Sequence, residues 1–62
     1  MRDTRSFKDG YAEAWALVMG GERPPRFPSF CVPLKQTPYQ YGLIRGQEDA
    51  EAVKAGAHLE DA

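Results

Sequence analysis

The sequence offers very little to a metal ion or a catalytic site. It contains one cysteine, Cys31, and one histidine, His58, among its 62 residues. A single cysteine cannot form an internal disulfide, which is the usual stabilising bond of small secreted domains. A zinc site needs several ligands at one place, and a cysteine nucleophile needs an oriented base. We therefore expect a cytoplasmic protein with no metal, no cofactor and no enzymatic activity.

Long apolar runs are also missing. The most apolar stretch, residues 12–19, contains Glu13 and is much shorter than the roughly 20 residues that cross a bilayer. The first residues are charged, which is not typical of a signal peptide. The sequence thus predicts no membrane span and no export signal.

Charge is nearly balanced overall but unevenly placed. The formal net charge is −1, yet residues 1–46 hold seven basic and four acidic residues, and residues 47–62 hold one basic and five acidic residues. Nucleic-acid binders normally show a clear positive excess, because phosphate contacts supply most of their affinity. Binding to RNA or to the ribosome therefore has less support here than binding to a protein.

The chain does have enough apolar material for one small domain over residues 1–62. Hydrophobic residues make up 42% and charged residues 27% of the sequence, which is too apolar for a disordered chain. A chain this short buries a small share of its surface, so its core is thin. Exposed aromatic side chains on a thin core favour self-association, and we expect a homodimer.

A first helix is predicted over residues 7–19. Ser6 followed by Asp9 resembles a capping box, in which side chain and backbone satisfy each other at a helix start. Apolar residues recur at positions 7, 11, 14 and 18, which line one helix face, and Trp15 and Leu17 widen that face. Gly20 and Gly21 then provide a left-handed stop.

Proline dominates the next segment. The five prolines lie at positions 24, 25, 28, 33 and 38, so residues 20–36 cannot form a regular helix. The segment also carries Phe27, Phe30 and Leu34, which makes it too apolar for a solvated linker. We expect this connector to pack across the helices.

A second helix is predicted over residues 38–56. Thr37 is a typical N-cap, Pro38 suits the first helical position, and Gln40 completes a capping box. Gly42 and Gly46 lie one turn apart and would let a neighbouring backbone approach closely. Spacings of three and four define one seam of mostly small residues: Tyr39, Leu43, Gly46, Ala50, Val53 and Ala57. The leading prediction is an all-α fold, a helical hairpin of two helices joined by a Pro-rich aromatic connector.

A β-hairpin competes with the second half of that prediction. Residues 30–34 and 39–44 are rich in aromatic and β-branched residues, and four residues separate them. In this alternative the fold is α+β, with a hairpin at about residues 30–44 between two helices.

Basic and aromatic residues interleave along the connector and the following segment. Arginine with tyrosine or phenylalanine is typical of protein interfaces and of surfaces that stack on single-stranded RNA. The alternative is that these rings only complete the thin core. The predicted binding anchors are Trp15, Arg26, Phe27, Phe30, Tyr39, Tyr41 and Arg45. An acidic face of Glu48, Asp49 and Glu51 is an alternative binding surface; because adjacent helical positions diverge, it does not suggest catalysis.

Several short motifs resemble the ribosome modulation factor family. That family has a Gly-Tyr in its first helix, and a Pro-Tyr followed by a Leu-Gly-Gly-Trp-Arg-Glu-Ala stretch in its second. The residues that carry the resemblance are Gly10, Tyr11, Pro38, Tyr39, Ile44, Gly46, Asp49 and Ala50. The resemblance implies two helices joined by an extended segment, and binding to ribosomes.

The chain departs from that family in four respects. The connector here is longer, and Cys31 and Pro33 are separated by Val32 and lie far ahead of Tyr39. Gln47 stands where the family has tryptophan, and the family is strongly basic whereas this chain is slightly acidic. The charge difference argues against a shared contact with ribosomal RNA and leaves the implied architecture intact.

Two functions follow from these observations. The leading hypothesis is a small non-enzymatic regulatory or inhibitor protein that binds a host or cellular protein complex. Phages and mobile elements encode such proteins, and anti-CRISPR and anti-restriction proteins are examples. The alternative is a ribosome-associated factor resembling ribosome modulation factor.

Overall fold

The computed structural model describes residues 5–56, which contain two α-helices. Helix α1 spans Phe7–Met19 and helix α2 spans Pro38–Lys54. No strand occurs within the described residues, and the connector between the helices has no regular structure. The all-α prediction is confirmed. The alternative β-hairpin at residues 30–44 is wrong, because α2 begins at Pro38 and runs through the whole of the expected second strand.

Both helices begin at the predicted capping boxes. In α1 the Ser6 hydroxyl accepts a hydrogen bond from the backbone N–H of Asp9 at 3.2 Å, and the Asp9 carboxylate accepts one from the N–H of Ser6 at 3.0 Å. Thr37 and Gln40 form the same reciprocal pair at 3.1 and 3.2 Å. These caps satisfy backbone donors that a first helical turn leaves without partners, so they fix where each helix starts.

Glycine follows the end of each helix. Gly20 adopts φ 76° after α1, and its N–H donates to the carbonyl oxygen of Ala16. Helix α2 ends at Lys54, short of the predicted end at residue 56, and Gly56 itself has φ 102°. The last residue of the predicted seam, Ala57, lies outside the described residues.

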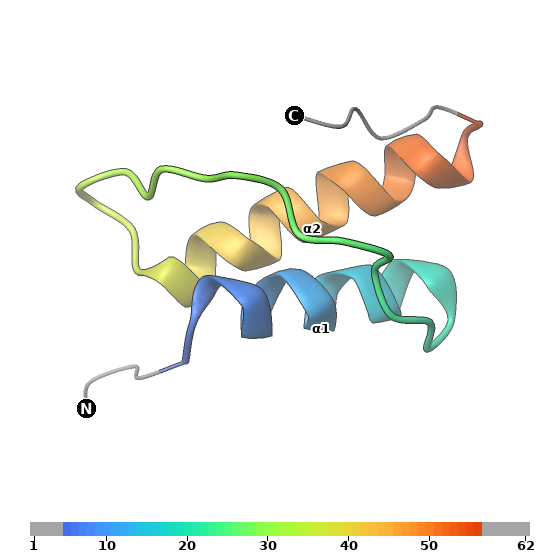
Figure 1. The fold of residues 1–62 in the computed structure, drawn as a ribbon, viewed down its shortest axis with the longest axis horizontal. Coiled ribbons are helices and arrows are strands. Elements are labelled where there is room, and N and C mark those ends of the chain that lie inside the picture. Colours follow the sequence, from blue (N-terminus) through green and yellow to red (C-terminus); the bar gives the residue numbers. More distant parts are fainter. Residues whose placement is uncertain (1–4, 57–62) are drawn as a thin grey trace.

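The two helices lie side by side and run in the same direction (Figure 1). Near their starts, Gly10 of α1 faces Tyr39 of α2. Near their ends, the ammonium of Lys54 donates to the carbonyl oxygen of Val18 at 3.5 Å. A connector between two parallel helices must travel back along their length. This requirement sets a minimum length for the segment between α1 and α2.

Three glycines bring the two helix backbones into direct contact. Gly10, Gly42 and Gly46 are all buried at this contact. A Cβ atom on Gly10 would overlap the carbonyl oxygen of Tyr39, and a Cβ on Gly42 would overlap that of Phe7. Gly46 likewise lies against the α1 backbone. The predicted close approach at Gly42 and Gly46 is confirmed, and only a residue without a Cβ fits at these positions.

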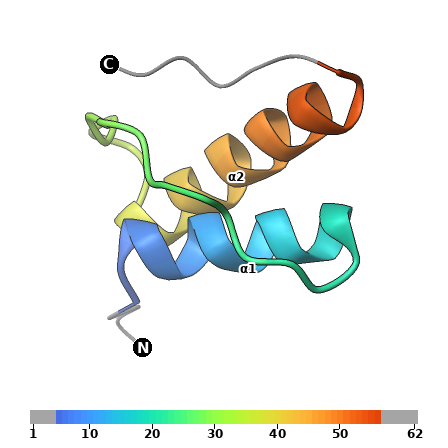
Figure 2. The same ribbon diagram turned by 45° about the vertical axis from the view of Figure 1, so that its right-hand side comes forward.

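The connector crosses one face of the helix pair (Figures 1 and 2). Its Phe30 ring stacks on Phe7 of α1, with ring centroids 3.8 Å apart and planes 10° apart. Its Phe27 ring packs against Tyr11 with centroids 5.6 Å apart. The prediction that the connector packs across the helices is confirmed.

Replacing Gly42 with alanine should destabilise the fold. Alanine favours a helix over glycine by about 1 kcal/mol, but its Cβ would meet backbone atoms of Phe7 and Tyr11, which cannot move aside as a flexible side chain can. We expect a net loss of about 2 kcal/mol in the free energy of unfolding, measured by urea titration with circular dichroism. The control Glu48→Ala, at an exposed position of the same helix, should change it by less than about 0.5 kcal/mol. Unchanged stability of Gly42→Ala would contradict the backbone contact.

Candidate binding surface

A row of buried aromatic rings lies along α1. Phe7, Tyr11 and Trp15 are spaced by four residues, so they occupy one helix face, and their exposed fractions are 2%, 0% and 2%. The centroids of the Phe7 and Tyr11 rings are 5.6 Å apart, and those of Tyr11 and Trp15 are 5.9 Å apart. Such a row fills much of the core with few residues, and it forms an apolar surface on which the connector packs.

Two rings of the connector pack on this aromatic row and remain partly exposed to solvent. Phe30 stacks on Phe7 and is 46% exposed, and Phe27 packs on Tyr11 and is 40% exposed. Each ring is therefore held by the core on one side and available to another molecule over the rest of its surface. Apolar rings that are both fixed in place and exposed are typical of binding anchors.

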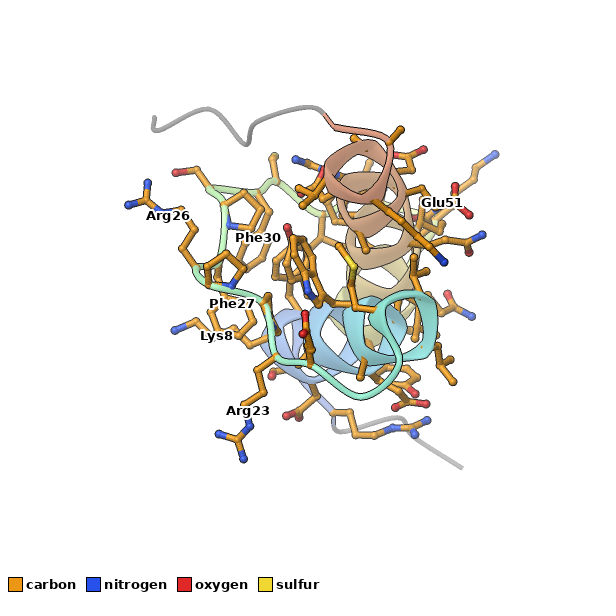
Figure 3. All side chains as sticks on the ribbon, turned by 90° about the vertical axis from the view of Figure 1, so that its right-hand side faces the viewer. Lys8, Arg23, Arg26, Phe27, Phe30 and Glu51 are labelled. Atoms are coloured by element: carbon orange, nitrogen blue, oxygen red, sulfur yellow. The ribbon has the colours of Figure 1, made fainter. Side chains whose placement is uncertain are left out.

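One cation lies near the Phe27 ring, and two others extend on the same side of the molecule. The ammonium of Lys8 lies 5.5 Å from the centroid of the Phe27 ring, within cation–π distance. Arg23 and Arg26 extend from the connector on the same side of the molecule as Lys8 (Figure 3). The carboxylate that follows Lys8 in sequence, Asp9, accepts a hydrogen bond from the backbone N–H of Ser6 at the start of α1. We call the surface of Lys8, Arg23, Arg26, Phe27 and Phe30 the connector face.

Tyr41 and Arg45 of α2 continue the same aromatic cluster. The Tyr41 ring lies 5.8 Å from Phe7 between centroids, and its hydroxyl accepts a hydrogen bond from Arg45 Nη1 at 3.1 Å. This hydrogen bond raises the pKa of Arg45 above its usual value, against the opposing effect of burial. Both side chains are half-buried, so they support the cluster more than they extend the exposed surface.

Two tyrosine hydroxyls join the helices across their contact. Tyr11 of α1 donates to the Asp49 carboxylate of α2, and Tyr39 of α2 donates to the Glu13 carboxylate of α1, both at 2.5 Å. Burial, then the hydrogen bond to Asp49, then the negative charge of Asp49 raise the pKa of Tyr11 well above its usual value. The phenol of Tyr11 therefore stays protonated in the folded protein.

Two of the predicted anchors are buried and cannot act as surface contacts in this conformation. Trp15 is only 2% exposed, because it completes the aromatic row on α1. Tyr39 is 7% exposed; its ring lies under the guanidinium of Arg5 at 3.6 Å. Their predicted role as exposed anchors is corrected, since the helix pair uses both side chains for its own core.

The predicted acidic face is divided. Asp49 is tied to the Tyr11 hydroxyl, and Glu48 and Glu51 are exposed. Glu51 lies on the side of the molecule away from Phe27 and Phe30 (Figure 3). Of the predicted binding residues, the structure thus groups only Arg26, Phe27 and Phe30 on one exposed surface.

Sequence reasoning missed Lys8 and misplaced Leu17. Lys8 joins the connector face only because the connector folds back over the first turns of α1, and no local pattern signals that return. Leu17 was expected to widen the buried face of the first helix, but it is 78% exposed. It lies near the end of α1, two residues before Met19.

Comparison with protein family models, curated proteins and solved structures gave no match. Among residues 5–56, no group of three or more His, Cys, Asp or Glu side chains is placed to hold a metal ion. No helix in this part of the chain is long and apolar enough to cross a membrane.

Stability should fall in alkaline solution because of Tyr11. An unfolded tyrosine ionises near pH 10, whereas the folded protein holds the pKa of Tyr11 higher, so the stabilisation is complete below about pH 10 and is lost as the pH rises further. Tyr11→Phe should be less stable at neutral pH by about 1 kcal/mol, because the hydrogen bond to Asp49 is lost. It should also lose less stability between pH 9 and 11, measured by urea titration at each pH.

Tyr41→Phe serves as the control for this titration. Tyr41 accepts its hydrogen bond from Arg45 of its own helix, whereas Tyr11 donates to the half-buried Asp49 carboxylate across the helix contact. Tyr41→Phe therefore leaves the Tyr11 hydrogen bond in place and should keep the alkaline loss of stability. An identical pH dependence for Tyr11→Phe and the native chain would show that Tyr11 does not cause that loss.

Proposed function

We propose that this chain is a small non-enzymatic regulatory or inhibitor protein that binds another protein through its connector face. The observation that carries the proposal is the pair of partly exposed rings, Phe27 and Phe30, each packed on a buried ring of α1, with Lys8 within cation–π distance of Phe27. The small size and the sparse catalytic chemistry of the sequence suit a protein, encoded by a phage or mobile element, that blocks a host protein complex.

The two connector rings are preorganised for binding, because both are already held against α1 in the free protein. Ordering flexible side chains at an interface costs about 0.5–1.5 kcal/mol each. Phe30 is already stacked on Phe7 and Phe27 is already packed on Tyr11, so most of this cost falls on folding rather than on association. Rigid aromatic anchors of this kind often dominate the energy of a protein interface.

The positive charge of the connector face indicates a partner with acidic groups at its binding site. Lys8, Arg23 and Arg26 give it a positive border, and Glu22 is the acidic residue beside Arg23 in sequence. A complementary partner has an apolar pocket for the phenylalanines and carboxylates around that pocket. Such a border mainly speeds association and makes it sensitive to salt.

Affinity capture with paired variants tests this proposal. The native chain, Phe27→Ala and the control Leu34→Ala are immobilised in parallel and exposed to a lysate of the source cell. Leu34 is fully exposed in the same connector, so the control removes a comparable apolar side chain outside the connector face. A protein partner should be retained by the native chain and by Leu34→Ala, and its affinity for Phe27→Ala should fall at least about tenfold.

The identified partner then allows a test of charge. Reversal of Arg23 to Glu should lower the association rate and flatten its dependence on salt, since that rate depends on the positive border. Equal retention of the partner by Phe27→Ala and the native chain, with both folded by circular dichroism, would reject the connector face as the binding surface.

Ribosome association is the second candidate, and one observation bears on it. Most of the residues that resemble ribosome modulation factor meet at the helix contact: Gly10 lies against Tyr39, Gly46 lies against the backbone of Tyr11, and Ala50 is fully buried. Pro38 and Ile44 of the same set are exposed. The buried members support a shared architecture, and they do not form the exposed surface that would contact a ribosome.

Co-sedimentation with ribosomes separates the two candidates. The connector face carries few cations, so we expect no binding at physiological salt and weak, nonspecific binding at low salt. Retention on ribosomes at physiological salt that Arg23→Glu weakens would favour the ribosomal candidate over a protein inhibitor.

A further inference from the structure

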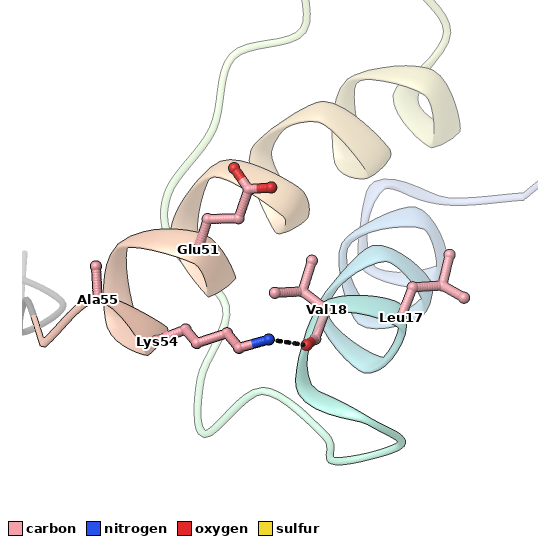
Figure 4. Close-up of a pocket in the computed structure, with 5 residues that line it drawn as sticks. All are labelled: Leu17, Val18, Glu51, Lys54 and Ala55. Carbon is pink, nitrogen blue, oxygen red and sulfur yellow. Dashed lines mark hydrogen bonds between the residues drawn. The ribbon is translucent and has the colours of Figure 1, made fainter.

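A second surface lies at the C-terminal ends of the two helices (Figure 4). It is a groove of about 520 Å³, and its lining residues are Leu17 and Val18 of α1 with Glu51, Lys54 and Ala55 at the end of α2. The groove is open to solvent rather than enclosed, so side chains from another molecule can reach its walls.

The walls of this groove combine an exposed leucine with charges of both signs. Leu17 is 78% exposed on the α1 wall. On the α2 wall, Glu51 accepts a long hydrogen bond from Gln47 at 3.3 Å, and Lys54 reaches the Val18 carbonyl oxygen at 3.5 Å. Both charged groups are exposed and held only by long hydrogen bonds, so each can turn to a partner.

We propose that this groove is the interface at which two copies of the chain associate. In a twofold arrangement each surface meets an identical surface, so a patch that pairs with itself must carry both an apolar contact and complementary charges. The groove has these features. Leu17 of one copy enters the groove of the other, while Glu51 of each copy faces Lys54 of the other.

A second copy fits this groove better than a different partner does. A surface selected for a foreign partner needs charges that complement that partner, as the positive border of the connector face would for an acidic protein. The groove instead presents one acid and one base less than a helical turn apart, and these complement each other across a twofold axis. Glu51 also lies on the side away from Phe27 and Phe30 (Figure 3), so this interface does not depend on the proposed function.

A charge-reversal pair provides the test. Glu51→Lys places two lysines opposite each other in each half of a homodimer, and Lys54→Glu places two glutamates there. Each variant alone should weaken association at least about tenfold, measured by sedimentation equilibrium, because like charges face each other twice. A mixture of the two variants restores both opposite-charge pairs, so it should associate about as tightly as the native chain.

Two further variants keep the test decisive. Leu17→Gln removes the apolar contact without changing charge and should also weaken association at least about tenfold. Phe27→Ala should leave association unchanged, because the connector face lies outside the interface. Circular dichroism first establishes that each variant retains the helix content of the native chain.

Three results would overturn this interface. The first is a native chain that stays a folded monomer in sedimentation at up to about 100 μM, since a dimer with a dissociation constant below that concentration would be largely formed there. The second is a mixture of Glu51→Lys and Lys54→Glu that associates no better than either variant alone. The third is loss of association in Phe27→Ala, which would place the second copy on the connector face.

Discussion

The direct contact between the α1 and α2 backbones determines where everything else in the molecule can go. With Gly10, Gly42 and Gly46 at the contact, no side chain separates the two helices there. The large side chains are therefore displaced to the flanks of the contact. On one flank Phe7, Tyr11 and Trp15 form the aromatic row, and Ala50 of α2 joins their cluster. Tyr39 is the large buried side chain outside that cluster, and its hydroxyl donates to Glu13. Most of the thin core of so short a chain is thus gathered along the aromatic row.

The parallel direction of the helices gives the connector its structural role. A 13-residue helix is about 20 Å long, and the connector must return over that distance before α2 can begin beside the start of α1. Extended chain needs only about seven residues for such a distance, at about 3.1 Å per residue, so residues 20–37 also have length for the turns at both ends. The prolines reduce the entropy that the unfolded chain loses on folding. The return path crosses the aromatic row, so the connector covers the core with Phe27 and Phe30. Phe27 and Phe30 remain 40% and 46% exposed because no other described segment covers them.

The helices were predictable because their signals are local. Ser6 with Asp9, and Thr37 with Gln40, lie within one turn of each other, and the backbone geometry of a helix start decides their pairing. The direction of α2 relative to α1 was not predictable, since it depends on which glycine meets which carbonyl across about 30 residues of sequence. The candidate binding residues likewise divide into those that local sequence predicts and those that depend on long-range contacts. Phe27 and Phe30 could be selected from composition, but the burial of Trp15 and the arrival of Lys8 beside Phe27 both follow from the return of the connector over α1.

The two proposed surfaces differ because the connector covers one face of the helix pair and does not line the groove at the helix ends. The connector supplies fixed rings and a positive border, which suit a foreign acidic surface. The groove at the helix ends has no covering segment among the described residues, and its mixed charges suit a copy of itself. Two copies joined through their grooves would keep both connector faces free, because Glu51 and the connector rings lie on different sides of each copy. A partner with two sites at matching separation would then bind the pair more tightly than either copy alone, without any new contact.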